Sequence, residues 1–175
     1  MTRESFIATV LPLREKCFRY AVTQLRNRPE SEDVAQEIML RLWDRRERLA
    51  QVDNLEAFAI RATRNLCIDR ARHSSWRTTD VDALYDAATA DTPADVRAEQ
   101  REAVAAVFGA AERLSEVQRA VFHLREVEQL SYAEIAAALD LSAAQVKVYL
   151  HRARKHVRQA IDPAHDPSHA KNVLR

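Results

Sequence analysis

The near absence of glycine limits the possible folds more than any other feature of this chain. One glycine, Gly109, and five prolines occur among 175 residues. A protein rich in β-sheet needs frequent turns, and glycine is the residue that most of those turns require. Alanine, leucine, arginine and glutamate, which all favour helices, are instead abundant. The composition therefore predicts an all-α protein whose helices are joined by short connections.

The bulk composition indicates a soluble globular protein. Hydrophobic residues make up 47% and charged residues 30% of the chain, and the formal net charge is only +1. This balance is typical of a protein that buries a core, and it identifies no partner by itself. The distribution of charge along the chain is uneven, and it is more informative than the net charge.

Cysteine use and the absence of targeting signals predict a cytoplasmic location. Cys17 and Cys67 have no C-x-x-C spacing, so we expect two buried free thiols in a reducing compartment. The first residues lack the basic, apolar and cleavable parts of a signal peptide. No apolar run approaches the ~18 residues of a membrane span.

The chain divides into compositional zones that predict two small helical domains joined by an acidic linker. Residues 1–78 form the first domain, 79–96 the linker, 97–161 the second domain, and 162–175 a frayed tail. The linker zone is rich in aspartate, and its alanine, threonine and proline content resembles a solvated connection. His165 and His169 in the tail have no supporting ligands, so no metal site is predicted.

Helical periodicity divides the first domain into three segments. Apolar residues recur at steps of three or four from Phe6 to Leu25 and form one continuous face. Ser31 is the expected start of the second helix, and Asp53 or Asn54 of the third. The inward positions are Val34, Ile38 and Leu42 on the second helix, and Phe58, Ala62, Leu66 and Cys67 on the third.

The second domain contains two helix starts only eleven residues apart. Ser131 with Glu134 and Ser142 with Gln145 each have the spacing of a capping box. A short helix from Tyr132 to Leu139, a tight turn and a longer helix from Ala143 form a helix-turn-helix. The turn has no glycine, so Asp140 or a neighbour must adopt the left-handed conformation.

The longer helix carries cations on its predicted outer face. Between Leu141 and Ile161 there are five lysines or arginines and no acid. A cationic outer face on the second helix of such a pair favours insertion into the major groove of DNA. The outward residues, predicted to contact DNA, are Gln145, Lys147, Val148, His151, Arg152 and Lys155.

A second basic helix lies at the end of the first domain. Five arginines occur between Arg61 and Arg77, against Asp69 as the one acid. Trp76 follows them and is either a stacking aromatic for nucleic acid or a core aromatic. No phosphate-binding glycine loop, catalytic triad or metal cluster accompanies these helices, so we predict a binding protein without catalytic residues, cofactor or small-molecule substrate.

Three motifs resemble the extracytoplasmic-function group of the sigma-70 family of bacterial RNA polymerase sigma factors. SEDVAQEIMLRLWDRRERL, FAIRATRNLCIDRARH and LSYAEIAAALDLSAAQVKVYLHRAR occur in the order and spacing of that family. The likeness extends from about Phe6 to Ile161. Phe58 replaces a frequent tryptophan, and Asp140 replaces the usual turn glycine.

The resemblance implies a transcription initiation factor and assigns roles to residues. Its partners would be promoter DNA, core RNA polymerase through the β′ clamp and β flap, and an anti-sigma factor. The outer face of the last helix would read the −35 element. The expected −10 residues are Arg64, Asn65, Asp69, Arg70, Arg72 and Trp76, and the expected polymerase-binding residues are Asp33, Gln36, Glu37, Leu40 and Trp43.

Two other functions remain compatible with parts of the sequence. A stand-alone helix-turn-helix regulator would explain the second domain, but it leaves the Ser31 segment without a role. A helical adaptor would explain the helices without any salt-sensitive DNA binding. Trp43 has a second interpretation as well, because it could cover the core instead of contacting polymerase.

Overall fold

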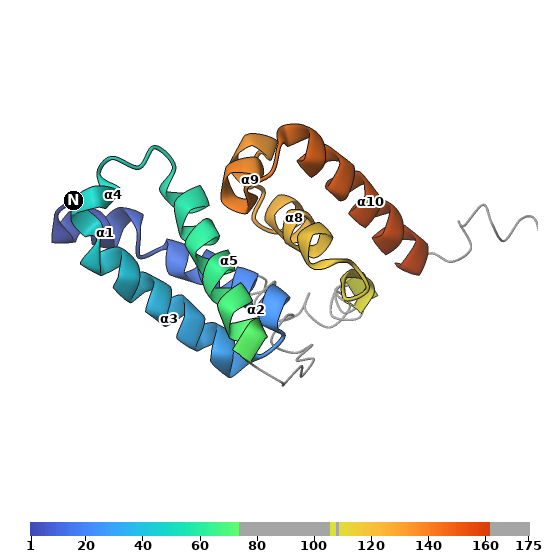
Figure 1. Ribbon diagram of the computed structural model, residues 1–175, viewed down its shortest axis with the longest axis horizontal. Coiled ribbons are helices and arrows are strands. Elements are labelled where there is room, and N and C mark those ends of the chain that lie inside the picture. The colour runs from blue at the N-terminus through green and yellow to red at the C-terminus, as the bar shows by residue number, and fades with distance from the viewer. Residues whose placement is uncertain (74–105, 108, 162–175) are drawn as a thin grey trace, which may run out of the picture.

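The protein is described by a computed structural model at residues 1–73, 106–107 and 109–161. Every regular element within these ranges is a helix, and the helices form two groups that lie side by side (Figure 1). The all-α, two-domain prediction is therefore confirmed. The acidic linker, Trp76 and the tail lie outside the described residues.

The N-terminal domain contains five helices around one core. These are α1 (Arg3–Thr9), α2 (Leu13–Leu25), α3 (Arg28–Asp44), α4 (Arg46–Leu49) and α5 (Leu55–His73). Helix α2 packs against both α3 and α5, and α3 also packs against α5. The core is therefore enclosed by the three longest helices.

The first predicted helical face is divided into two helices. The sequence pattern predicts a continuous face from Phe6 to Leu25, but α1 ends at Thr9 and α2 begins at Leu13 after Pro12. Both pieces still direct their apolar residues, including Phe6, Val10 and Cys17, into the same core. Because the interruption between the two helices is short, their apolar residues still lie on the same side.

The start of α3 differs from the prediction at Ser31. Asn27 is the N-cap, and its side-chain oxygen accepts a hydrogen bond from the Glu30 N–H at 3.0 Å. Ser31 lies inside the helix, where its buried hydroxyl donates to the Asn27 carbonyl at 2.6 Å. Pro29 does not end a helix here, because a proline in the first turn has no intrahelical N–H to lose.

Asn54, one of the two predicted caps, directly precedes helix α5. The Asn54 side chain accepts a hydrogen bond from the Ala57 N–H at 2.8 Å. The prediction that Phe58 points inward is wrong, since its side chain is 37% exposed. Helix α5 instead buries residues on two sides, with Ala59 and Leu66 in the N-terminal core and Ala57 and Ile60 in a second cluster.

Both cysteines are free and buried in the N-terminal core, as expected. Burial raises the pKa of the Cys17 thiol to about 11, and it also raises the pKa of Cys67. Both thiols are therefore protonated at neutral pH and react poorly with electrophiles.

The C-terminal domain (residues 109–161) contains the predicted helix-turn-helix. After helical residues at 109–111, the domain contains α8 (Glu116–Glu126), α9 (Tyr132–Leu139) and α10 (Ala143–Ile161). Capping boxes start all three helices, at Ser115 with Gln118, Ser131 with Glu134, and Ser142 with Gln145. These paired hydrogen bonds fix each helix start locally, which explains why the sequence predicts the boundaries so closely.

The two domains pack directly against each other. Helix α5 lies beside α9, and α2 lies beside α8 (Figure 1). Tyr20, Ala57 and Ile60 of the N-terminal domain share one buried cluster with residues of the C-terminal domain, namely Ala120, Val121, Leu124, Leu130, Ile135, Ala138, Leu139, Val146 and Leu150. No pattern in the sequence predicted this shared core.

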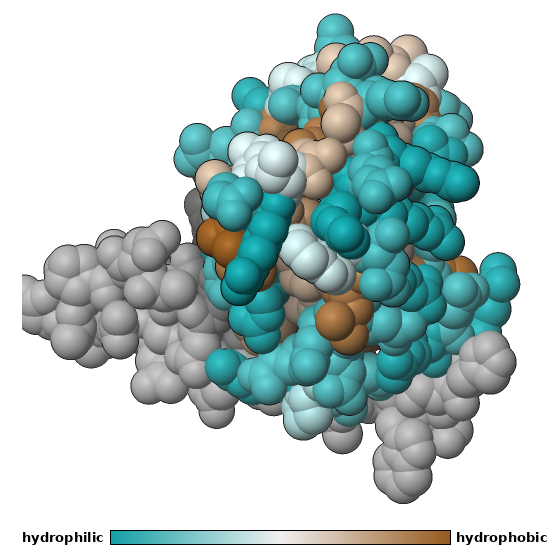
Figure 2. Space-filling model, turned by 90° about the vertical axis from the view of Figure 1, so that its left-hand side faces the viewer, coloured by the Kyte–Doolittle hydropathy of each residue, from teal (hydrophilic) through white to brown (hydrophobic). Residues whose placement is uncertain are grey.

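The end of the molecule formed by α1 and α4 is mostly hydrophilic, with small hydrophobic patches between the polar residues (Figure 2). Among the described helices, none combines the length and apolar character that crossing a membrane requires.

Candidate nucleic-acid interface

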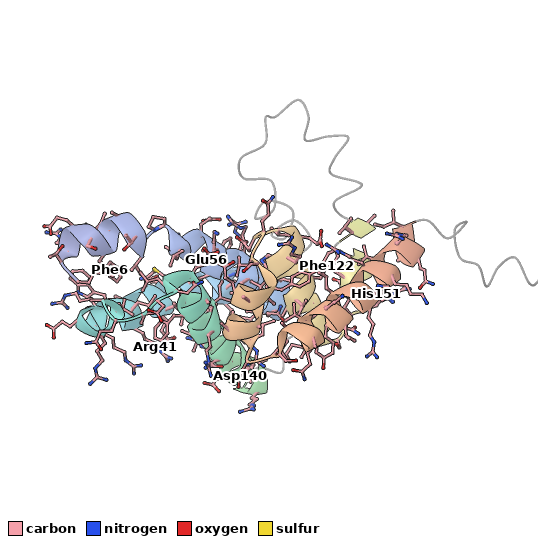
Figure 3. All side chains as sticks on the ribbon, turned by 90° about the horizontal axis from the view of Figure 1, so that it is seen from above. Phe6, Arg41, Glu56, Phe122, Asp140 and His151 are labelled. Atoms are coloured by element: carbon pink, nitrogen blue, oxygen red, sulfur yellow. The ribbon has the colours of Figure 1, made fainter. Side chains whose placement is uncertain are left out.

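Helix α10 has one buried face and one open face. Val146, Leu150, Ala153 and Val157 are buried against α8, α9 and the residues just before α8. The six outward residues predicted from the sequence, Gln145, Lys147, Val148, His151, Arg152 and Lys155, are all exposed. Figure 3 shows His151 on α10, away from the N-terminal domain. The faces of this helix therefore divide as predicted.

The cations of α10 are available for a partner. Arg154 pairs with Glu126 of α8, with its Nη2 2.7 Å from Glu126 Oε1. Within the part of the chain that the structure describes, Lys147, Arg152 and Lys155 have no ion-pair partner. Unpaired cations on one face of a helix attract phosphate oxygens of nucleic acid.

Gln145 has a structural task besides any contact with DNA. Its side-chain oxygen accepts a hydrogen bond from the Ser142 N–H at 2.8 Å, and its own N–H donates to the Ser142 hydroxyl at 3.2 Å. The amide NH₂ group of Gln145 remains available for a base edge.

Asp140 adopts the left-handed conformation that the missing turn glycine requires. Its φ and ψ angles are 59° and 49°, and its backbone N–H donates to the Ala136 carbonyl. Its side chain is exposed and lies 3.9 Å from Arg61 of α5. Figure 3 shows Asp140 where the helix-turn-helix meets α5.

The predicted −10 residues on α5 are divided among three environments. Asn65, Asp69 and Arg72 are exposed, and Arg70 is half-buried beside α3. Arg64 lines a cavity of about 270 Å³ between the domains, together with Glu30, Cys67, Glu112, Glu116 and Arg119. Trp76 lies outside the described residues, so the structure does not bring all six predicted residues onto one surface.

An ion pair joins the predicted −10 surface to the predicted polymerase-binding surface. Arg70 of α5 donates to Glu37 of α3 at 2.8 Å, and Arg41 donates to the other oxygen of the same carboxylate. The hydrogen bond from Arg70 lowers the pKa of Glu37, and the same pair raises the pKa of Arg70. Each of the two predicted surfaces therefore contributes one member of a single pair.

The predicted polymerase-binding residues of α3 are mostly exposed. Asp33, Gln36 and Leu40 face solvent, and Leu40 is 58% exposed although it is apolar. Trp43 is only partly exposed. Its ring meets Phe6 edge to face at 5.1 Å, and the Arg46 guanidinium lies 4.6 Å from its centre. Trp43 therefore covers the core, as its second interpretation held, while part of its surface remains accessible.

Polar contacts also join the two domains, and no pattern in the sequence predicted them. Arg19 of α2 pairs with Glu128, which follows α8, and Asn54 donates to Glu134 of α9 at 3.3 Å. Nothing in the local sequence around Arg19 or Glu128 indicates a pairing 109 residues apart. Within the described ranges, no group of three metal-ligating side chains occurs.

Comparison with known proteins matches both domains. Residues 10–77 match the family model "Sigma-70 region 2", and residues 105–157 match "Sigma-70, region 4". The RNA polymerase sigma-E factor of Streptomyces antibioticus is 30% identical over 133 residues, which cover 76% of this chain and 71% of that protein. The ECF RNA polymerase sigma factor SigG of Mycobacterium tuberculosis is 29% identical over 191 residues.

A solved structure has the same fold. The sigma factor RpoE from Bartonella quintana, in complex with the anti-sigma factor NepR, matches with a TM-score of 0.72 and 16% identity. The match covers 91% of this chain and 98% of that one. The chain spans about half the length of the Mycobacterium tuberculosis relatives SigI and SigG, 52% and 50%. The two region matches and the sigma-E relative show that this chain belongs to the extracytoplasmic-function group of the sigma-70 family of RNA polymerase sigma factors.

Proposed function

We propose that the protein is a sigma factor that directs core RNA polymerase to promoters with specific −10 and −35 elements and starts transcription there. The observation that supports this most strongly is the open face of α10, where unpaired cations stand opposite a fully buried apolar face. A helix-turn-helix with this arrangement fits the second helix into the major groove and places lysine and arginine side chains on phosphates.

The proposal distributes the tasks over three helices. Helix α10 contacts the −35 element through Lys147, Val148, His151 and Arg152, with Gln145 and Lys155 beside them. Helix α5 and Trp76 contact the −10 element. Helix α3 binds the polymerase β′ clamp through Asp33, Gln36, Glu37, Leu40 and Trp43, while the C-terminal domain contacts the β flap.

The domain boundaries of this proposal are those predicted from composition. Residues 1–78 recognise and melt the −10 element, residues 79–96 connect the domains, residues 97–161 recognise the −35 element, and residues 162–175 form a tail. The proposed protein acts in the cytoplasm and performs no catalysis itself, because nucleotide polymerisation belongs to the polymerase. An anti-sigma factor is a proposed partner, and the anti-sigma complex of the Bartonella quintana relative supports it.

Run-off transcription with core polymerase tests this function. The purified chain should produce a promoter-specific transcript from a template that carries the −35 and −10 elements mapped after its overexpression. Polymerase alone and a template with a scrambled −35 element are the controls. No specific transcript, together with tight binding of the free chain to a palindromic site, would instead identify a stand-alone regulator.

A further inference from the structure

A buried ionic contact holds the two domains together. Arg19 of α2 donates from Nε and Nη2 to the two carboxylate oxygens of Glu128, at 2.7 and 2.8 Å. The Glu128 side chain is 1% exposed and that of Arg19 is 18% exposed. Burial raises the pKa of Glu128, but the hydrogen bonds from Arg19, together with the nearby His123 ring, outweigh this effect and lower the pKa to about 2. Glu128 is therefore a buried, ionised carboxylate at neutral pH.

Two further residues complete the contact, one from each domain. The Thr23 hydroxyl donates its proton to the Arg19 carbonyl at 2.9 Å, so it must accept from His123 Nδ1–H, which lies 3.1 Å away. The other ring nitrogen of His123 then faces Glu128 Oε1 at 3.4 Å. Arg19, Thr23, His123 and Glu128 form a unit that we call the interdomain polar cluster.

The packed arrangement places the two DNA-contacting helices too close together for one promoter. Helix α9 packs against both α5 and α10. With helix axes 8–10 Å apart at each contact, α5 and α10 are separated by only about 20 Å where they pack. The −35 and −10 positions are about 25 base pairs apart, which is ~85 Å along B-form DNA at ~3.4 Å per base pair. Contacts at opposite ends of the two helices would add only about 28 Å, the length of one such helix, to the separation of about 20 Å. The packed protein therefore cannot reach both promoter elements.

The packed arrangement also covers part of the predicted −10 surface. Arg64 lies in the cavity between the domains with three carboxylates, Glu30, Glu112 and Glu116. Arg61 is 3.9 Å from Asp140, so the start of the basic stretch of α5 faces the turn of the helix-turn-helix. A phosphate would have to compete with these acidic groups for both arginines.

We propose that the packed arrangement is a promoter-silent state of this protein, and that the interdomain polar cluster sets how readily the domains separate. This inference rests on the proposed function for its promoter-silent part. The apolar part of the interface favours packing of the two domains, but it does so without directional contacts. The Arg19–Glu128 pair adds a directional contact that is lost as soon as the domains move apart, because both partners are fixed on opposite domains.

Replacing either member of the pair should favour separation. Glu128→Gln leaves Arg19, which can reach solvent, whereas Arg19→Gln leaves a buried carboxylate without its cation. We expect the opening equilibrium to rise about 10-fold for the first variant and about 100-fold for the second. Glu126→Gln is the matched control, because Glu126 lies two residues away and pairs with Arg154 within the C-terminal domain.

Small-angle scattering of the full-length chain measures separation directly. The radius of gyration should increase in the order wild type, Glu128→Gln, Arg19→Gln, with helical circular dichroism unchanged and Glu126→Gln equal to wild type. With limiting core polymerase, the two cluster variants should also give several-fold more promoter-specific transcript than wild type.

Three outcomes would overturn the proposal. The first is an unchanged radius of gyration in both cluster variants. The second is an increased radius of gyration in the cluster variants without more transcript than an active wild type gives. The third is loss of helical signal in both variants, which would show that the cluster supports folding instead of domain contact. A wild type without specific transcript contradicts the proposed function, while the scattering comparison still decides whether the cluster holds the domains together.

Discussion

Helices α5 and α10 are both 19 residues long and both carry the arginines expected of a DNA-contacting helix, yet the protein uses them differently. Helix α10 buries one stripe and leaves the opposite face open. Helix α5 buries residues in two separate clusters, so its arginines have acidic neighbours from α3 and from the C-terminal domain. A helix with one buried side displays its charges, whereas a helix with two buried sides has few free charges left.

The strongest test of the face assignment on α10 compares two apolar residues of this helix. Leu150→Ala should lower the free energy of unfolding by about 3 kcal/mol, because Leu150 is 1% exposed and its removal leaves a cavity. Val148→Ala is the control, since Val148 is 46% exposed and should change stability by less than about 0.5 kcal/mol. Urea unfolding measures both variants, and equal losses would mean that the faces are assigned wrongly.

Arg152→Ala tests the function of the open face. It should weaken binding to promoter DNA about 10-fold or more and reduce the dependence of affinity on salt, while affinity for core polymerase stays the same. Arg154→Ala is the matched control two residues along, because Arg154 is engaged with Glu126. Fluorescence anisotropy across a salt series measures the effect. A loss of polymerase binding in the Arg152 variant would point to misfolding.

Acid should separate the two domains through Glu128. The pKa of Glu128 is lowered from the ordinary value of 4.5 to about 2, so its contribution to the closed arrangement is complete above about pH 4.5. The contribution is lost as the pH falls from 4.5 toward 2, because the carboxylate takes up a proton. Besides Arg19 and His123, the titratable groups near this contact include Glu15, 3.8 Å from Arg19, and the Cys17 thiol, whose pKa the charge of Glu128 helps to raise.

Scattering from pH 6 down to 3 measures this loss. Wild type should expand as the pH falls, whereas Glu128→Gln should be expanded at every pH and show a smaller change. An identical pH profile in both proteins would show that other carboxylates control the domain contact.

The Glu37–Arg70 pair tests whether α3 and α5 act together. Glu37→Lys should lower affinity for core polymerase about 10-fold if Glu37 contacts the clamp, as proposed. It should also release Arg70, so that binding of single-stranded −10 DNA increases slightly. Glu32→Lys is a control on the same helix, because the ion pair of Glu32 within the described ranges is the local one with Arg28. Unchanged polymerase affinity in the Glu37 variant would remove this residue from the interface.

The smallest expected effect concerns the turn that joins α9 to α10. Asp140→Gly should raise the free energy of unfolding by about 0.5 kcal/mol, since a left-handed residue is less strained as glycine. Asp140→Val should lower it by about 1 kcal/mol, because a β-branched side chain fits this conformation poorly. Thermal unfolding of the two variants measures the difference, and a destabilised glycine variant would show that the Asp140 side chain matters more than its backbone.

The sequence predicted best what is decided locally. The helix starts at Ser131 and Ser142, the left-handed Asp140 and the outward residues of α10 depend on neighbours within a few positions. The start of α3 was misassigned to Ser31 because Pro29 resembles a helix breaker in the sequence. Phe58 was misassigned because a single apolar stripe cannot describe a helix that packs on two sides.

Contacts between the domains could not be predicted in the same way. Arg19 and Glu128 are 109 positions apart. Arg19 is an ordinary charged residue of α2, and Glu128 is an ordinary charged residue of the connection that follows α8. Tyr20 and Ile60 look like members of the N-terminal core, although they pack against the C-terminal domain. The contacts of these residues depend on how the two domains are placed, which local sequence patterns do not encode.

The positions of the two cysteines allow thiol labelling to report on two motions of the protein. Cys17 lies in the N-terminal core, whereas Cys67 also lines the cavity between the domains. No other cysteine occurs in the chain. A thiol-reactive dye added to unlabelled protein should therefore modify Cys67 at a rate set by domain separation, and Cys17 only at the slower rate of unfolding. Two reaction phases in one sample would time both events without any engineered label.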